Sequence, residues 1–276
     1  MTEIDLLRGL LLLALALAPL GTHRVLLPPT RLGSAAHGLA FLCAAVGLFF
    51  VPPLCGVWLL YCAGSFAHFL WHHRASLSSS RAVIGSVPFV FSNIAALWLV
   101  GGANDLAILG YGPTFSFYAS AHGNILGWMT VGAIAILGTQ KRPGAKLYII
   151  AALVCFASFL LVAVGIDGVM GAKRVGVVGL SVAIPVAQLV FLRSVWRTHK
   201  GAFVLGCTSF LGLAATFVLA WQYELGALSF PALAGVRPMV SVHGVINGVV
   251  VAPCFLLAVT LEARRHCEAS AALESR

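Results

Sequence analysis

Two histidine-containing segments hold the residue types best suited to acid–base chemistry. Residues 120–127 read SAHGNILG and residues 241–248 read SVHGVING, so both contain the pattern H-G-x-x-x-G. An imidazole accepts or donates a proton near neutral pH. We therefore predict that His122 and His243 transfer protons, and that Asn124 and Asn247 stabilise a developing negative charge.

The spacing within each segment predicts different roles for the two asparagines. His243 and Asn247 are four residues apart, which places them on one face of a helix, where the amide could hold the imidazole in one tautomer. Asn124 is two residues beyond His122 and is expected to point elsewhere. The glycines also have a simpler explanation, because small residues four apart let membrane helices approach closely. The shared pattern indicates a parallel internal repeat.

Further polar residues are expected at the same depth as these histidines. Asn93 lies within an apolar run, whereas Asp167 and Glu224 end two others, and we predict that all three belong to the site. Together with the histidines they favour a polar cavity that opens outward. The alternative is that the acidic residues are solvated helix ends. Other polar residues expected near this level are Asp105, Tyr111, Gln222, Tyr223 and Arg237.

A second group of histidines is expected near the cytoplasmic boundary. His37 lies 15 residues before Pro52 and His68 lies 15 residues after Pro53. On two antiparallel helices this spacing sets both imidazoles about 22 Å from the turn, where they could face each other and hold haem or a single metal. The alternative for His68 is a hydrogen-bonded core residue.

Residues 68–73 also give H-x-x-x-H-H, a spacing used by membrane di-iron enzymes. One such box cannot supply a di-iron site, so we expect no metal and no cofactor. His72 and His73 are instead expected in an interfacial belt at the membrane surface. His23, His199 and His266 are expected in cytoplasmic loops, without a special role.

The elements that position these residues are membrane helices. The chain has 276 residues, of which 60% are hydrophobic and 9% charged, and its mean hydropathy is +0.99. This composition excludes a water-soluble domain and nucleic-acid binding. We predict one all-α polytopic helical bundle over residues 1–276, with a short cytoplasmic tail at 263–276. Nine spans are expected at 4–21, 33–51, 54–72, 82–102, 114–138, 145–166, 174–193, 201–222 and 238–261.

The basic residues predict how this bundle is oriented. If the nine helices cross the membrane in alternating directions, thirteen of the 17 lysines and arginines lie on one side of the membrane. The other four, Arg8, Lys173, Arg174 and Arg237, lie on the opposite side. Positive residues concentrate on the cytoplasmic side, so the N-terminus is expected outside and the C-terminus in the cytoplasm. Glu3 and Asp5 argue against a cleaved signal peptide. The seven cysteines lie almost entirely in apolar runs and are expected to be packing residues.

Three short motifs resemble the YndJ-like family of bacterial polytopic membrane proteins. They are LAPLG at residues 17–21, AHF at 67–69 and HGVING at 243–248. Family members typically show Ala-His-Phe-His in the second motif, where this chain has Leu70 in place of the second histidine. The resemblance implies a multi-pass bundle in a bacterial cell membrane and little about chemistry.

The function is therefore inferred from the predicted site residues. We predict an integral-membrane enzyme that acts on a lipophilic small molecule from the bilayer, by cyclisation, isomerisation or epoxide opening. No nucleotide-binding loop, redox fingerprint or Ser-His-Asp order is evident in the sequence. The alternatives are a small-molecule or proton-coupled transporter, and a protein that binds haem or metal through His37 and His68.

Overall fold

The computed structural model shows a bundle of long helices. It describes residues 2–140, 142, 144–166, 168–226, 232 and 235–274, with side chains up to residue 265. Within this part the chain is 86% helical and has no strands, and nine helices are long and apolar enough to cross a membrane. These features confirm an all-α, multi-pass membrane fold.

The nine candidate spans follow the expected order. They are α1 (Glu3–Leu26), α2 (Arg31–Phe49), η1 with α3 (Pro52–His72), α4 (Ser80–Ala103), α5 with η3 and α6 (Pro113–Thr139), α7 (Ala145–Ile166), α8 (Met170–Val195), α9 (Lys200–Glu224) and η4 with η5 and the start of α10 (Met239–Arg265). A short turn, η2 (Arg74–Ser76), lies between α3 and α4. The helix α10 itself is Ala252–Glu274, so the backbone of the expected tail remains helical through residue 274.

The first helix is longer than expected, and this corrects the placement of His23. The sequence predicted an end at residue 21 with His23 in a loop, whereas α1 continues to Leu26 and His23 is partly buried. Thr22 is satisfied within the helix because its Oγ1 donates to the Ala18 carbonyl at 2.8 Å. The helix ends just before Pro28 and Pro29, which cannot continue it.

Side-chain caps begin several of these helices. Thr2 and Asp5 form a capping box, in which Thr2 N–H donates to Asp5 Oδ2 at 2.8 Å and Asp5 N–H donates to Thr2 Oγ1 at 3.2 Å. Thr30 caps α2 and Ser79 caps α4 by accepting backbone N–H groups. His199 caps α9 through Nδ1, which accepts the Ala202 N–H at 3.2 Å. Such caps satisfy N–H groups that the helix leaves free.

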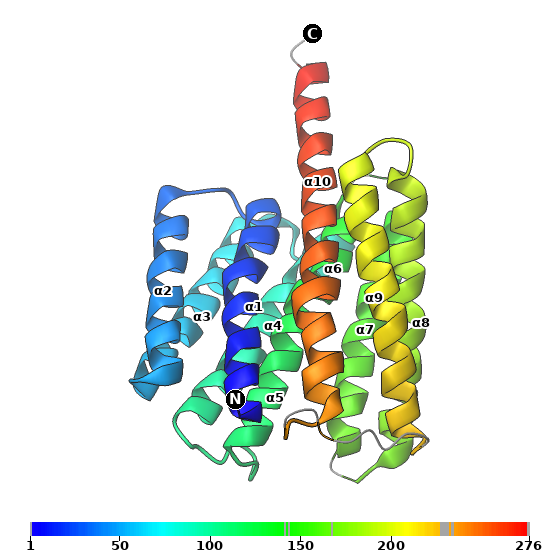
Figure 1. Cartoon of the computed structure of the whole chain (residues 1–276). Helices are drawn as coiled ribbons and strands as arrows, with labels where there is room; N and C mark the ends of the chain where they lie inside the picture. The colour runs from blue at the N-terminus through cyan, green and yellow to red at the C-terminus, as the bar shows by residue number, and fades with distance from the viewer. Residues whose placement is uncertain are drawn as a thin grey trace.

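The span made of α5 (Pro113–His122), η3 (Gly123–Val131) and α6 (Gly132–Thr139) lies at the centre of the bundle. In its most apolar window 89% of the residues are buried, which is the largest fraction among the nine spans. Figure 1 shows α1 and α10 in front of it, α2 and α3 on one flank, and α7, α8 and α9 on the other. We call the end of the bundle that holds the start of α1 the outer end, and the opposite end the inner end.

Both H-G-x-x-x-G segments adopt π-helical turns. The first begins at His122, the last residue of α5, and continues in η3, whereas the second spans η4 (Met239–Gly244) and η5 (Ile246–Val251). A π-turn is wider than an α-turn and changes which backbone N–H and C=O groups bond to each other. Two carbonyls in these turns accept hydrogen bonds from side chains: Thr130 Oγ1 donates to Ile125 O at 3.0 Å, and Ser209 Oγ donates to Val251 O at 2.8 Å. Such turns are frequent at functional sites.

The glycines of both segments make close helix contacts, as expected for small residues in membrane helices. A Cβ at Gly123 would lie 2.8 Å from Cβ of Ala95, and one at Gly127 would overlap the ring of Phe91. A Cβ at Gly248 would lie 2.9 Å from a methyl of Leu10 and 3.1 Å from one of Ile125. The second segment therefore packs directly against the first.

Reporter fusions test the orientation of the bundle. A reporter placed before Met1 and one placed after Arg276 should report opposite compartments, with the N-terminal one outside, because an odd number of spans separates them. Two reporters in one compartment would contradict the predicted arrangement and the assignment of the outer end to the extracytoplasmic side.

Substitution of Gly127 tests the central packing. Gly127→Ala should destabilise the folded protein by about 1–3 kcal/mol, because its methyl group has to displace the Phe91 ring. Gly64→Ala is the matched control: nothing lies within 4 Å of the added carbon, and alanine favours the helix. Thermal unfolding of the detergent-solubilised variants checks this. Equal melting temperatures for both variants would rule out the close contact.

Candidate functional site

His243 is held by a backbone carbonyl of the neighbouring helix. Its Nδ1 lies 3.1 Å from Thr216 O on α9. A carbonyl only accepts hydrogen bonds, so Nδ1 carries the proton and Nε2 keeps its lone pair. The imidazole is therefore set in the tautomer that presents a base.

Asn247 lies beside His243 as expected, but its role differs from the prediction. Its Nδ2 donates to the backbone carbonyl of His243 at 2.8 Å, and its Oδ1 accepts from Thr216 Oγ1 at 3.3 Å. The carbonyl of Thr216 holds the ring, whereas Asn247 joins α9 to the helix that carries His243. The prediction that the amide sets the tautomer was wrong, because a residue four positions on reaches the backbone of the preceding turn.

His122 has the same hydrogen-bond pattern on α5. Its Nδ1 lies 2.9 Å from Tyr118 O, one turn earlier, so Nε2 is again the basic nitrogen. The side chain is exposed, whereas that of His243 is partly buried. The segments that carry the two histidines pack against each other, since a Cβ at Gly248 would lie 3.1 Å from a methyl of Ile125. The structure thus brings together the two segments that the sequence singled out.

Three residues beside His122 form a network that the sequence did not predict. Arg237 donates through Nη2 to Glu3 Oε1 at 2.6 Å and through Nε to Glu3 Oε2 at 3.1 Å. The same Nη2 lies 2.8 Å from the hydroxyl of Tyr118, and that hydroxyl donates to Glu3. Hydrogen bonds to this carboxylate raise the pKa of Arg237 above its usual value.

This network joins segments that are far apart in sequence. Glu3 and Arg237 are 234 residues apart, and Tyr118 supplies the carbonyl that holds His122. The four-residue spacing of Tyr118 and His122 was the available sequence signal, since it places them on one helix face. Nothing in the sequence connects Glu3 to them.

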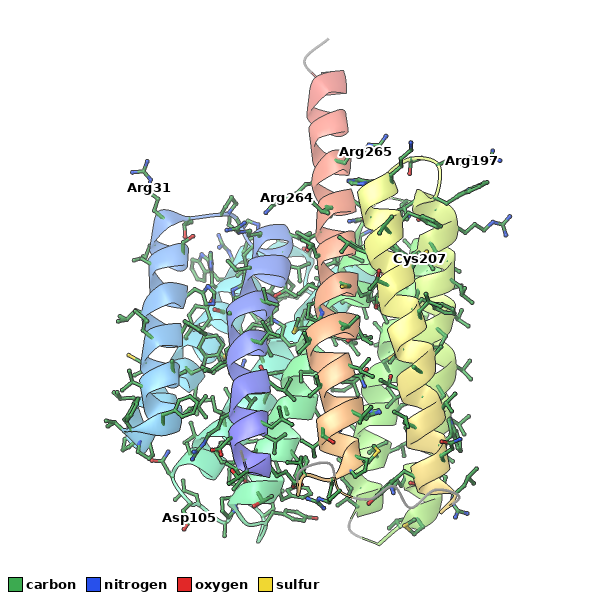
Figure 2. All side chains as sticks on the ribbon, viewed as in Figure 1. Arg31, Asp105, Arg197, Cys207, Arg264 and Arg265 are labelled. Atoms are coloured by element: carbon green, nitrogen blue, oxygen red, sulfur yellow. The ribbon has the colours of Figure 1, made fainter. Side chains whose placement is uncertain are left out.

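The other predicted residues lie in different surroundings. The side chain of Glu224 is 6% exposed and pairs with Lys173 Nζ at 2.5 Å and Arg174 Nε at 3.9 Å, across α8 and α9. Asp167 lies outside the described residues. Asp105 is exposed on the loop after α4, at the outer end in Figure 2.

The remaining asparagines bond mainly to their own helices. Asn124 is fully buried, and its Nδ2 donates to Ser120 O at 2.9 Å, so it points elsewhere than His122 as expected. Asn93 donates to Phe89 O at 2.8 Å and to Cys62 O of α3 at 3.3 Å. Catalytic roles for Asn93, Asn124, Glu224 and Asp167 stay predictions.

The inner histidines do not form the facing pair that their spacing allowed. His37 Nε2 lies 3.1 Å from Leu15 O on α1, whereas His68 is exposed. His72 is exposed and His73 partly buried, in contact with each other at the end of α3, where Arg74 lies over the Trp71 ring. Within the described part of the chain, no group of three or more residues could hold a metal ion.

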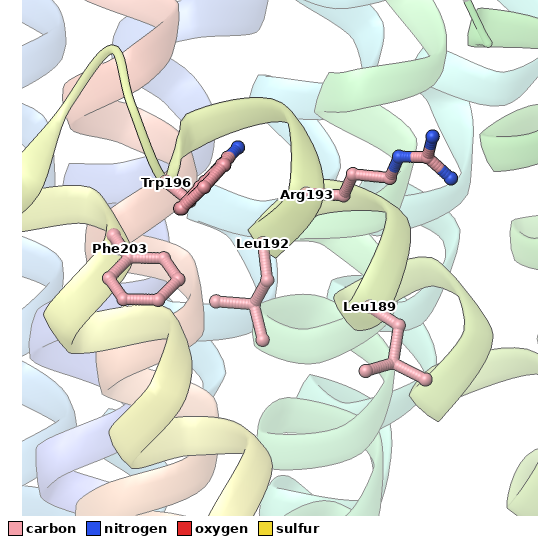
Figure 3. A pocket seen from close by; sticks show the side chains of 5 residues that line it. All are labelled: Leu189, Leu192, Arg193, Trp196 and Phe203. Atoms are coloured by element: carbon pink, nitrogen blue, oxygen red, sulfur yellow. The ribbon is translucent and has the colours of Figure 1, made fainter.

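A surface hollow lies at the inner end of α8 and α9, far along these helices from Glu224. Figure 3 shows the side chains that line it, Leu189, Leu192, Arg193, Trp196 and Phe203. None of the predicted site residues belongs to it, so it has no place in the acid–base site.

Comparison with known proteins identifies the family of the chain. Residues 10–251 match the family described as YndJ-like protein, which covers most of the 276 residues. No curated protein matches the sequence, and no solved structure matches the fold. The matched range includes the central span, His122, His243 and Arg237. The chain belongs to the YndJ-like family.

Proposed function

We propose that this protein is a membrane-embedded enzyme that acts on a lipophilic small molecule by histidine acid–base chemistry. The observation that carries the proposal is the matching geometry of His122 and His243, on two segments that pack against each other. Each imidazole is fixed through Nδ1 to a backbone carbonyl, and each keeps a basic Nε2. Fixed orientation and a free basic nitrogen are what proton transfer requires.

In the proposed reaction one of the two imidazoles is protonated and the other is neutral, so the pair contains one acid and one base. The acid protonates one atom of the substrate while the base removes a proton from another. Cyclisation, isomerisation and epoxide opening all use such an exchange, and none of them changes the net number of protons on the enzyme.

The Glu3–Tyr118–Arg237 network acts as support for this pair. It ties the start of α1 to α5 and to Arg237, two residues before η4, and Tyr118 in turn holds His122. A carboxylate bound by a guanidinium and a phenol stays charged and oriented. Glu3 is therefore a positioning residue, which acts on the chemistry through Tyr118 and His122.

The surroundings favour a lipophilic substrate. Leu10 and Ile125 pack against the glycines that follow His243, and the helices around the pair are apolar. A molecule dissolved in the bilayer reaches such a site without crossing water. We further propose that the protein lies in a bacterial cell membrane with its C-terminus in the cytoplasm, since the basic residues concentrate at the inner end.

A carrier is the second candidate. The π-helical turns in two spans favour it, because transporters bind their substrates where membrane helices are irregular. An enzyme makes a new compound, whereas a carrier changes only where a compound is found. Chemical analysis of cells therefore separates the two candidates.

Replacing the histidines tests the enzyme. Lipid extracts of cells that produce the wild-type protein should contain a compound absent from cells without it, with unchanged mass and altered retention in the case of cyclisation or isomerisation. His122→Ala and His243→Ala should each lower its amount by about 10²- to 10⁴-fold, as expected for a lost general acid or base. Liquid chromatography with mass spectrometry measures the effect.

The matched controls for this experiment are His72→Ala and His73→Ala. Both residues lie at the inner end of α3, so their replacement should leave the compound unchanged. Loss of the compound in these two variants, with His122→Ala and His243→Ala active, would exclude the outer site. A compound that is only redistributed between cells and medium would favour the carrier.

Replacing Asn247 tests whether this residue only positions His243 or takes a direct part in proton transfer. Asn247→Ala should lower product formation less than His243→Ala does, because it removes the bonds to His243 O and Thr216 Oγ1 and leaves the proton-transferring ring in place. Thr216→Val, which removes the hydroxyl and keeps the carbonyl, should have a similar small effect. An Asn247→Ala effect as large as that of His243→Ala would assign the amide a direct role.

A further inference from the structure

The surface hollow between the inner ends of α8 and α9 is lined mainly by apolar side chains of two candidate membrane spans. Its volume is about 410 Å³. Small-molecule pockets in proteins have volumes of about 300–1,000 Å³. Leu189, Leu192 and Phe203 form its apolar part, and Figure 3 shows Arg193 at its edge. A hydrocarbon chain from the bilayer suits this lining better than a water-soluble molecule does.

Trp196 marks the level of the membrane surface beside the hollow. It directly follows α8, lines the hollow and is 52% exposed. Tryptophan side chains concentrate where the hydrocarbon layer meets the lipid head groups. Leu189 and Leu192 precede Trp196 along α8, so this apolar part of the hollow lies on the hydrocarbon side. The loop after Trp196 then lies at the level of the head groups.

Three exposed basic side chains lie at this level, and none forms an ion pair with another described residue. Arg193 lines the hollow from α8. Arg197 lies over the ring of Trp196, with its Cζ 4.3 Å from the ring centroid. Lys200 is three residues before Phe203 on α9, which places both on one face of that helix. Positive charge therefore borders the hollow from both helices.

Two other arginines at this end of α8 already have partners within the protein. Arg142 donates through Nη2 to Ser194 Oγ at 2.6 Å, and Arg265 donates to the carbonyl of Thr198. Residues 189–203 contain no aspartate or glutamate that could neutralise the three exposed basic side chains. These three side chains are therefore available to an anion at the membrane surface.

We propose that the hollow binds one anionic phospholipid. An acyl chain of this lipid lies along Leu189, Leu192 and Phe203, and its phosphate group lies at the inner edge. There Arg193 and Lys200 bind the phosphate oxygens through charge-assisted hydrogen bonds, which long basic side chains can form from the edge of the hydrocarbon layer. Basic pockets between membrane helices bind anionic head groups in this way. This inference uses no residue of the acid–base site and stands independently of the proposed enzyme.

Lipid titration followed by native mass spectrometry tests the proposal. The purified full-length protein in detergent should bind palmitoyl-oleoyl phosphatidylglycerol more tightly than phosphatidylcholine with the same chains, which carries no net charge. Arg193→Gln should weaken the binding of phosphatidylglycerol about tenfold, the effect of one lost hydrogen bond between charged groups. Arg31→Gln is the matched control and should bind as wild type does, because Arg31 is exposed at the inner end of α2, on the opposite flank of the bundle in Figure 2.

Filling the hollow tests the place of the acyl chain. Leu189 is 50% exposed, so Leu189→Trp can occupy the hollow without changing the charge, and it should lower the affinity for phosphatidylglycerol. Leu211→Trp, on an exposed position of α9 outside the hollow, should not. Equal affinities for the two lipids, or wild-type affinity in Arg193→Gln or in Leu189→Trp, would overturn the proposal. Displacement of the lipid by equimolar glycerol phosphate, which has no acyl chains, would also overturn it and indicate a site for free phosphate.

Discussion

The close approach of the central span to α4 and α1 is the contact on which the rest of the structure depends. Within a bilayer, lipid tails are as apolar as leucine, so helices associate through tight packing and hydrogen bonds rather than through the hydrophobic effect. Gly123, Gly127 and Gly132 allow this packing against Ala95, Phe91 and Pro88. The bond from Trp128 to Thr22 of α1 then sets the depth of the span against its neighbour.

Contacts at both ends of the bundle follow from this one helix. Its outer end places Tyr118 and His122 beside Glu3 and the start of η4, and its inner half places Trp128 beside His23. The two groups of contacts differ in chemistry because their members differ. The outer group contains a carboxylate and a guanidinium, whereas the inner group consists of aromatic rings.

The histidines show how a membrane protein satisfies polar side chains without water. His122, His243 and His37 each use one ring nitrogen to bond a backbone carbonyl. An unsatisfied polar group in hydrocarbon is costly, so one bond is the minimum that keeps such a ring inside the bundle. That bond also decides the tautomer, which leaves the second nitrogen available for chemistry in His122 and His243.

The sequence by itself determined the class of the protein and the number of its spans. Apolar runs long enough to cross a bilayer are a local property, and all nine appear as helices in the described part of the chain. It also singled out His122 and His243, because ionisable residues in apolar runs are rare and recur here within one motif. The end of α1 was misjudged because the apolar run ends at residue 21, whereas Leu256 packs on Gly21 and Ala18 O accepts from Thr22, so the helix continues.

Only the tertiary structure decided which residues surround the histidines. Glu3 and Arg237 form an ion pair although they are 234 residues apart in the sequence, and the carbonyl of Thr216, on another helix, bonds to His243. The same is true of His23, which the sequence placed in a loop and the fold placed among the rings of Tyr61, Phe89 and Trp128 from three other spans. Depth in the membrane is encoded locally by hydropathy, but the direction in which a side chain points depends on how helices pack, and that depends on contacts between residues that the sequence keeps far apart.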